Sequence, residues 1–273
     1  MKKISALEVF SKAFYFTFSS FDLIFLIFLI TGITNTISLI ILSSYTIPTT
    51  VINEINPDTI AYKENEFNTL ILWIGIVIFS VLVSVLSATI AYLYVFTKRG
   101  RKTNLLKILY KTKDYYIGVL ILGLIIFSVF LIPAAPFLIL FLIQLYGSFA
   151  DLMIILFFIL LAIALYIHLR LSLSLPIYFK RKNIKESLKE SWKLMKGNVF
   201  KLFLILVLIT LISLGFVFVE MLIISMFPPI YFLVDFFVLD VVLSIISSFF
   251  GSIITVLSIS AHVFFYLKLK GKK

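Results

Sequence analysis

The chain has no cysteine, only two histidines and few charged residues of either sign. Without cysteine it can form no disulfide, no thiolate metal site and no cysteine nucleophile. Two histidines are too few for the three protein ligands of a catalytic zinc centre unless carboxylates complete the set. Only 14% of the 273 residues are charged, against about 25% in a soluble protein. We therefore expect no enzyme activity, no bound metal and no cofactor.

Hydrophobic residues take the place of the missing charges. They make up 62% of the chain, and the mean hydropathy is +1.17. A water-soluble fold of this length could not bury so much apolar surface. The excess is therefore expected to face lipid, and the composition indicates a membrane protein.

Six stretches free of Asp, Glu, Lys and Arg are long enough to cross a bilayer. Each has at least 18 residues, and a helix needs roughly 20 to cross about 30 Å of hydrocarbon. We predict an all-α polytopic membrane protein in which residues 1–273 form a single transmembrane domain. Pro133 and Pro136 fall inside the third stretch, so we expect a kinked or shortened helix there, or a broken helix lining a substrate site. The predicted spans lie near residues 21–42, 69–96, 117–143, 150–170, 200–224 and 238–266.

Basic residues are distributed asymmetrically about these spans. All but one of the 24 Lys and Arg fall in the termini and loops of one side, and only Lys63 falls on the other. Because cytoplasmic loops carry the Lys and Arg excess, we predict a cell-membrane protein with both termini in the cytoplasm and residues 43–68 outside. The net charge of +11 would suggest nucleic acid in a soluble protein. Here the bases flank apolar runs, so anionic lipid headgroups are the expected partner and nucleic acid is not.

A basic amphipathic helix is predicted over residues 184–196. Asn183 and Glu186 form a capping pattern at its start, and Gly197 is placed to end it. One face carries apolar residues at helical spacing, namely Ile184, Leu188, Trp192 and Met195. Such a helix is typical of the membrane interface, where its apolar face would be buried at the headgroup boundary. The residues expected to contact anionic lipid are Trp192, Lys185, Lys189, Lys193 and Lys196.

The same pattern can be laid without gaps over two other places. Shifted by 178 residues it falls on residues 6–18, where Ser5 and Glu8 reproduce the capping pattern. Shifted by 82 residues it falls on residues 102–114, where that pattern is missing. We therefore predict three cytoplasmic interfacial helices in a threefold pseudo-repeat of interfacial helix, span and span. The alternative to a true repeat is that any helix next to a membrane has this amphipathic pattern. The aligned pairs are Leu188 and Trp192, Phe10 and Phe14, and Leu106 and Tyr110.

The segment 170–206 resembles a known family. The similar pieces are Arg170 at the inner end of a span, Pro176, and the pairs Ser187-Leu188, Ser191-Trp192 and Gly197-Asn198. They resemble the fourth and fifth helices of the glycerophosphodiester phosphodiesterase membrane-domain group, which includes six-helix inner-membrane proteins of bacteria and archaea. The resemblance implies a six-helix membrane fold and a cell-membrane location. It implies no activity, because in the family's named enzymes the phosphodiesterase activity belongs to a separate soluble domain. The longest stretch expected to lie away from the membrane, residues 43–68, is too short for that domain.

Five polar residues near the span ends are candidate site residues. His168 and Arg170 end the fourth span and His262 lies near the inner end of the sixth. Interfacial packing explains them, and headgroup binding or proton transfer is the alternative. Glu220 and Asp240 lie near the outer boundary, where carboxylates are tolerated without a function or could bind a cation.

Three hypotheses about function remain. We favour a non-catalytic multi-pass protein that organises or senses membrane lipid or protein, since interfacial helices recur and no catalytic motif is present. The alternative is a transporter or channel for a small solute or lipid, supported by the pseudo-repeat and the hydroxyl-rich sixth span. A membrane-embedded enzyme is third. A lined cavity holding Glu220, Asp240 or His262 would favour transport, whereas convergence of His168, His262 and an acid would favour catalysis.

Overall fold

The computed structural model describes residues 5–55, 62–98, 104–134, 150–225 and 236–271, and every regular element within these ranges is a helix. The helices are α1 (Ala6–Phe18), α2 (Phe21–Ile55), α3 (Tyr62–Thr97), α4 (Leu105–Leu131), the 3-10 turn η1 (Ile132–Ala134), α6 (Ala150–Leu171), α7 (Ser174–Arg181), α8 (Ile184–Leu194), α9 (Val199–Ser225) and α10 (Phe236–Lys270).

Six helices are long and apolar enough to cross a membrane, so the prediction of six spans is confirmed. The chain is a multi-pass membrane protein. The candidate spans are Phe21–Ile41, Leu70–Thr97, Leu105–Leu131, Ile154–Arg181, Val199–Ile223 and Asp240–Lys270.

Three of the helices are much longer than a bilayer requires. α2, α3 and α10 have 35, 36 and 35 residues, or about 50 Å each where about 30 Å suffices. α2 continues past Pro48 to Ile55, and α3 begins at Tyr62. Much of the stretch 43–68, which the sequence suggested was a loop, is therefore helical. An interior proline removes one backbone hydrogen bond but need not end a helix whose other bonds are made.

The middle interfacial helix is not a separate element. α4 begins at Leu105, where the side chain of Asn104 accepts a hydrogen bond from the Leu106 amide at 3.0 Å, and it runs without interruption to Leu131. The predictions of a third interfacial helix around Leu106 and Tyr110, and of a span beginning at 117, are thus wrong. No proline lies between residues 105 and 131 to end the helix. α4 stops just before Pro133, as either a shortened or a broken helix would; residues 135–143 lie outside the described part of the chain.

The other two copies share their local structure. Ser5 and Asn183 both act as N-caps, accepting from the Glu8 amide at 3.5 Å and the Glu186 amide at 3.1 Å. Both predicted caps are therefore confirmed. The helices that follow begin at Phe21 and Val199, which are again 178 residues apart. The buried positions also correspond at this shift, being Val9, Ala13 and Thr17 in the first copy and Ser187, Ser191 and Met195 in the second.

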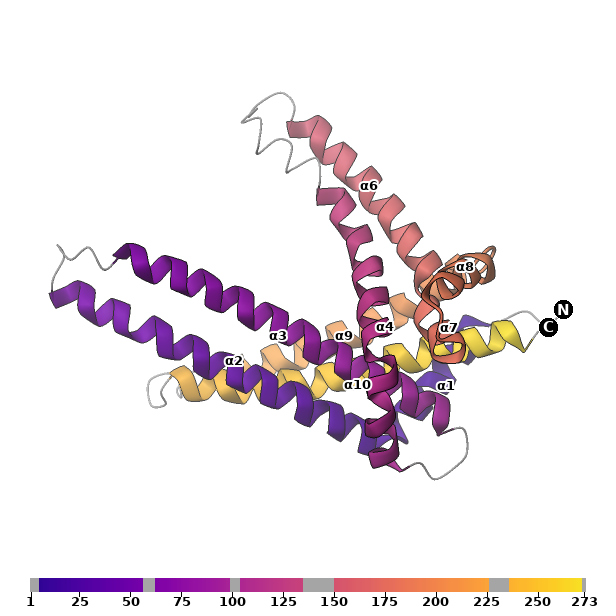
Figure 1. Cartoon of the computed structure of the whole chain (residues 1–273), viewed down its shortest axis with the longest axis horizontal. Coiled ribbons are helices and arrows are strands. Elements are labelled where there is room, and N and C mark those ends of the chain that lie inside the picture. Colours follow the sequence, from indigo (N-terminus) through magenta and orange to yellow (C-terminus); the bar gives the residue numbers. More distant parts are fainter. Residues whose placement is uncertain (1–4, 56–61, 99–103, 135–149, 226–235, 272–273) are drawn as a thin grey trace.

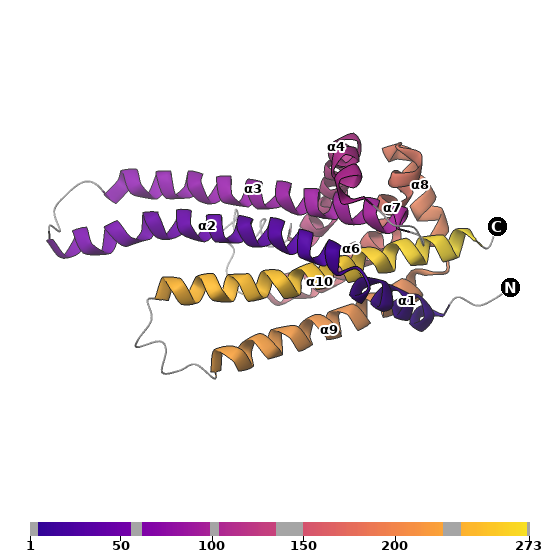
Figure 2. The same ribbon diagram turned by 90° about the horizontal axis from the view of Figure 1, so that it is seen from below.

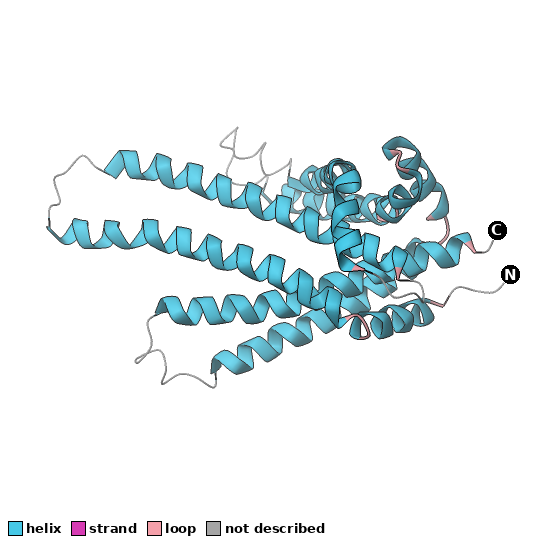
Figure 3. Cartoon of the chain, turned by 60° about the horizontal axis from the view of Figure 1, so that its bottom comes forward, coloured by secondary structure: helices cyan, strands magenta, loops and turns pink. Residues whose placement is uncertain are grey.

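The helices meet at one end of the molecule and separate toward the other (Figure 1). The short helices α1, α7 and α8 and both chain ends lie at the shared end, which we call the base. From the base, the α4–α6 pair runs in a different direction from the α2–α3 hairpin. α2, α3, α9 and α10 lie roughly alongside one another in a second view (Figure 2), and the all-helical character is plain in a third (Figure 3).

The buried core is concentrated at the base. One hydrophobic cluster joins α2, α3, α4, α7 and α10, and a second joins α1, α6, α7, α9 and α10. Tyr94, Phe265 and Tyr266 are the largest fully buried side chains. Farther along the helices, large apolar side chains such as Phe127 and Phe218 are more than half exposed. This is the arrangement expected when lipid covers the outer parts of the helices.

Candidate functional site

Arg170 joins α6 to α8 at the base. It lies in the last turn of α6 and is 9% exposed. Its Nη2 donates to the main-chain oxygen of Trp192 at 2.7 Å, and its Nη1 donates to the Tyr166 hydroxyl at 2.8 Å. In the opposite direction, the Ser191 hydroxyl donates to the Arg170 carbonyl oxygen at 2.8 Å. The end of α6 is thus tied to α8 by two hydrogen bonds, while the bond to Tyr166 stays within α6.

The positive charge of Arg170 is stabilised by uncharged groups, namely two aromatic rings and a main-chain carbonyl oxygen. Its guanidinium carbon lies 4.3 Å from the centre of the Trp192 ring and 5.7 Å from that of Tyr166, so both aromatic faces attract it. The Trp192 carbonyl belongs to the last turn of α8, at the negative end of the helix dipole. No carboxylate pairs with Arg170 in the described part of the chain. A cation without an acidic partner makes this end of the protein attractive to anions.

α8 packs against the protein along one face. Ser187, Ser191 and Met195 are fully buried, and Leu188 packs partly against the α2–α3–α4 cluster. The expectation that Leu188, Met195 and Trp192 all meet the headgroups is therefore corrected for Met195. The small serines let α8 approach its neighbours α6 and α7 closely, which turns Met195 into the core. Trp192 stays 41% exposed at the edge of the contact.

The four predicted lysines are exposed in a row, three of them on α8 and Lys196 just after its end. Within the described residues, no carboxylate pairs with Lys185, Lys189, Lys193 or Lys196. The two glutamates of α8 face other cations instead. Arg181 Nε lies 2.6 Å from Glu190 and Arg181 Nη1 lies 3.1 Å from Glu186, while Lys270 Nζ lies 3.6 Å from Glu190. We call the four lysines together with Trp192 the α8 lysine row.

α1 is attached to α10 in a related way. Glu8 forms ion pairs with Lys268 in the last turn of α10 and with Lys12 one turn along α1, the latter at 3.2 Å. The hydrogen bond from Lys268, followed by that from Lys12, holds the pKa of the Glu8 carboxyl below its ordinary value. The last turn of α10 therefore contacts both amphipathic helices, since its Lys268 pairs with Glu8 of α1 and its Lys270 pairs with Glu190 of α8.

A further polar cluster at the base was not singled out from the sequence. The buried Tyr94 hydroxyl donates to Asp22, whose other oxygen lies 3.4 Å from Lys98 Nζ. Lys98 also donates to the Ser20 hydroxyl at 3.2 Å and lies 4.8 Å from the centre of the Tyr94 ring. These bonds fix the junction of α1 and α2 against the end of α3. The sequence contained one indication of this cluster, because Asp22 begins the first predicted span and Lys98 directly follows the second.

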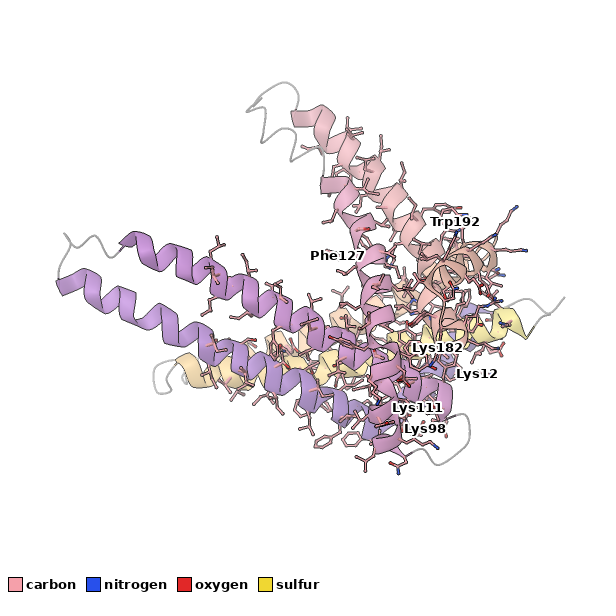
Figure 4. The ribbon with its side chains drawn as sticks, in the orientation of Figure 1. Lys12, Lys98, Lys111, Phe127, Lys182 and Trp192 are labelled. Atoms are coloured by element: carbon pink, nitrogen blue, oxygen red, sulfur yellow. The ribbon has the colours of Figure 1, made fainter. Side chains whose placement is uncertain are left out.

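The basic side chains gather at the base in a view with side chains drawn (Figure 4). Lys12, Lys98, Lys111, Lys182 and Trp192 all lie there, whereas Phe127 lies farther along α4. This places lysines from α1, α4 and the α7–α8 junction on the same end of the molecule. The base is thus both the packed core and the cationic end of the protein.

The two histidines lie on different helices, His168 on α6 and His262 on α10. The His168 ring is 4.7 Å from that of Phe130, and its Nδ1 is buried without a hydrogen-bond partner. His262 Nδ1 lies 2.8 Å from the Ser258 carbonyl oxygen. No group of three His, Asp or Glu that could hold a metal ion occurs among the described residues. The convergence of both histidines with an acid, which would favour catalysis, is not found there.

Glu220 and Asp240 line separate clefts far from Arg170. Glu220 lies in a groove of about 230 Å³ between α9 and α10. Asp240 lies in a larger cleft of about 520 Å³ among α2, α3 and α10. Both clefts are open on one side, and Ser247 on α10 borders both. A lined cavity with Glu220 or Asp240 is therefore present, although neither is a closed central channel and His262 lines neither.

Comparisons of the chain with protein-family models, with curated proteins and with solved structures found no match. The resemblance of residues 170–206 to the phosphodiesterase membrane-domain group stays an expectation from the sequence. The function must be argued from the arrangement of residues at the base and in the clefts.

Proposed function

We propose that this protein is a non-catalytic protein of the cell membrane that binds and organises anionic lipid at its basic end. Both termini and the base would face the cytoplasm, where the membrane surface is negative. One observation carries the proposal. The α8 lysine row is exposed without acidic partners among the described residues, while Arg170 fixes α8 to the end of α6, within a candidate span. The lysines are thereby held beside the membrane-spanning part of the chain.

The chemistry of the α8 lysine row suits anionic headgroups. Each lysine near a negative membrane surface contributes about 1 kcal/mol at most, and salt screens the attraction. The two glutamates of α8 are occupied by Arg181 and Lys270, so they oppose the attraction less than their number suggests. Trp192 is half exposed and stacked on Arg170, and such an amphipathic ring favours the headgroup region. The expected ligand is a lipid phosphate group.

The divergence of the helices supports a role in arranging lipid. Buried side chains are concentrated at the base, and the α4–α6 pair leaves it in a different direction from α2 and α3. Large apolar side chains on these outer parts are exposed. Lipid tails would therefore fill the space between the diverging helices, because none of the described residues covers that apolar surface.

The packing of the amphipathic segments supports the threefold pseudo-repeat. If the units are α1–α3, α4–α6 and α8–α10, each begins with an amphipathic segment. α4 packs against α3, α8 against α6, and α1 against α10. Each unit thus contacts the last span of the unit before it, with the first unit contacting the third. We infer that the base is a pseudosymmetric ring in which α1 closes the circle.

Native mass spectrometry of the full-length protein would test the lipid proposal. The protein would be titrated in detergent with phosphatidylglycerol and, separately, with phosphatidylcholine. We expect more phosphatidylglycerol than phosphatidylcholine to stay bound. Replacing the four lysines of the α8 lysine row by glutamine should abolish this preference, whereas replacing them by arginine should keep it. Equal binding of both lipids by the unmodified protein, or an unchanged preference after the glutamine substitutions, would overturn the proposal.

A second candidate function is the transport of a small solute or lipid. It is favoured by one observation, namely that Asp240 lines a cleft of about 520 Å³ among three candidate spans. Binding in such a cleft is the first step that a transporter requires. Movement across the membrane would be tested by uptake into proteoliposomes, with Asp240→Asn as the inactive variant. Uptake equal in both proteins would remove this candidate.

A further inference from the structure

The cleft around Asp240 differs in its lining from the other clefts of the described chain. Six of its eight lining residues have polar side chains, and they come from three helices. They are Asn35 and Ser38 on α2, Ser80 on α3, and Asp240, Ser244 and Ser247 on α10. A neighbouring cleft of about 290 Å³ between α2 and α10 is lined mainly by apolar residues, among them Phe28 and Ile245. The groove at Glu220 has three polar lining residues, namely Ser213, Glu220 and Ser247. Of the three clefts, the one at Asp240 therefore offers a polar ligand the largest set of partners.

The polar cleft reaches from a membrane boundary into the bilayer. Asp240 is the first residue of the sixth candidate span and lies at the end of α10 away from the base. Asn35 lies 14 residues after the start of α2, or about 21 Å along that helix. There Asn35 donates to the Ser248 hydroxyl at 2.9 Å, which ties α2 to α10. Asp240 thus lies at the mouth, and the Asn35–Ser248 bond lies deeper along the same two helices.

Lipid tails are poor occupants of this space. A hydroxyl or amide that leaves water without a hydrogen-bond partner costs several kcal/mol in hydrocarbon, and a carboxylate costs more. Close packing of the serines of α10 against another helix would explain a row of small residues, but it would leave no cleft. Asn35 and Ser38 already donate within the protein, to the Ser248 hydroxyl and to the Thr34 carbonyl oxygen. Water or a polar molecule in the cleft would satisfy the Asp240 carboxylate and the other hydroxyls.

The charge of the cleft determines which polar molecule fits. Asp240 is the only ionisable residue in the lining. No Lys, Arg or His pairs with it in the described ranges of the chain. The site therefore offers one negative charge together with neutral hydroxyl and amide groups. We propose that the cleft is a water-filled binding site for a small organic cation, with Asp240 as its counter-charge.

This proposal does not depend on lipid binding by the α8 lysine row. In the cleft, the ammonium group of the cation would lie near the Asp240 carboxylate. The hydroxyls of Ser38, Ser80 and Ser244 would form hydrogen bonds with the rest of the ligand. An anion would meet the carboxylate and no compensating positive charge. The site should therefore select by the sign of the charge, which is the property to measure.

Because the chain has no cysteine, a single Ser244→Cys substitution gives one thiol in the cleft. The full-length variant would be placed in lipid nanodiscs, where both membrane faces are open to reagents. It would be treated separately with a trimethylammonium methanethiosulfonate and with a sulfonate methanethiosulfonate of similar size. The matched control is Ile245→Cys, one residue away on α10 in the apolar cleft. The two rates of Ser244→Cys would then be measured again with Asp240→Asn and with Asp240→Glu.

We expect Ser244→Cys to react with both reagents and Ile245→Cys to react much more slowly. The cationic reagent should react about tenfold faster than the anionic one after correction for their rates with a free thiol. Asp240→Asn should remove that preference and Asp240→Glu should keep it. A Ser244→Cys thiol as unreactive as that of Ile245→Cys would show that the cleft holds no water. A reactive thiol without charge preference, or a preference unaffected by Asp240→Asn, would show that it is no cation site.

Discussion

Arg170 and Trp192 are 22 residues apart in the chain, yet the guanidinium of the first lies 4.3 Å from the centre of the indole ring of the second. The same guanidinium donates to the Trp192 carbonyl oxygen at 2.7 Å. The pair connects the end of α6 to the last turn of α8, so a candidate membrane span determines where the lysines of α8 lie. In the proposed function, this contact sets where the protein meets lipid headgroups.

The contact predicts that Arg170 keeps α8 docked. Arg170→Ala removes the charged hydrogen bond and the ring contact that Arg170 makes to Trp192 on α8, and should destabilise the docked state of α8 by about 3 kcal/mol. Hydrogen exchange followed by mass spectrometry should then show faster exchange in residues 184–194 than in α9. Tyr166→Phe, which removes only one acceptor of Arg170, should have a smaller effect of about 1 kcal/mol. If both variants exchange alike, Arg170 does not hold α8.

The close contact of α4 with α7 predicts different outcomes for two glycines of the same helix. A Cβ added at Gly118 would overlap the ring and hydroxyl of Tyr178, which is buried on α7. Gly118→Ala should therefore cost about 1–3 kcal/mol of stability and lower the thermal unfolding midpoint. Gly123→Ala meets no atom within 4 Å and should leave the midpoint unchanged or raise it. A tolerated Gly118→Ala would contradict the packing of α4 on α7.

The ion pairs of Glu8 predict an acid-sensitive attachment of α1. Because Lys268 and Lys12 lower the pKa of Glu8 in the folded protein, these pairs stabilise docking at every pH above the ordinary value of about 4.3. The contribution is lost as the pH falls through the lowered folded value. Hydrogen exchange in residues 6–18 would be compared between the unmodified protein and Glu8→Gln. The difference between them should be present at about pH 7 and should disappear only as the pH falls below the ordinary value of about 4.3. A difference that persists in acid would show that these ion pairs do not attach α1.

The distribution of basic residues predicts the orientation in the membrane. Thr59→Cys and Lys193→Cys would each introduce the only thiol of the chain; position 59 lies outside the described residues. An impermeant thiol reagent added to intact cells should label the first variant, and it should label the second only after the cells are opened. Labelling of position 193 but not of position 59 in intact cells would contradict the predicted orientation.

The sequence was informative wherever structure depends on near neighbours or on composition. Six apolar stretches predicted six candidate spans, and the caps at Ser5 and Asn183 could be read from residues three apart. The end of α4 before Pro133 follows from the geometry of proline. The predicted start of the third span failed because amphipathic and apolar segments without a breaker join into a single helix.

The contacts that build the base could not be read from the sequence. Arg170, His168 and Trp192 were each singled out, but nothing in a linear pattern states that Arg170 and Trp192 touch. The pairing of Tyr94 with Asp22 joins residues 72 apart, and it depends on how α2 and α3 pack. The burial of Met195 depends on the docking of α8 rather than on its own apolar periodicity. The cleft at Asp240 likewise exists only because three helices diverge around it.

The fluorescence of Trp192 tests lipid binding at α8 most directly. Trp73→Phe leaves Trp192 as the only tryptophan, and the full-length variant would be reconstituted with lipids that carry bromine near the headgroup. At equal mole fractions, brominated phosphatidylglycerol should quench Trp192 more strongly than brominated phosphatidylcholine. The excess should decrease as salt is raised and disappear when the four lysines of the α8 lysine row are replaced by glutamine. Equal quenching by the two lipids at low salt would contradict the account.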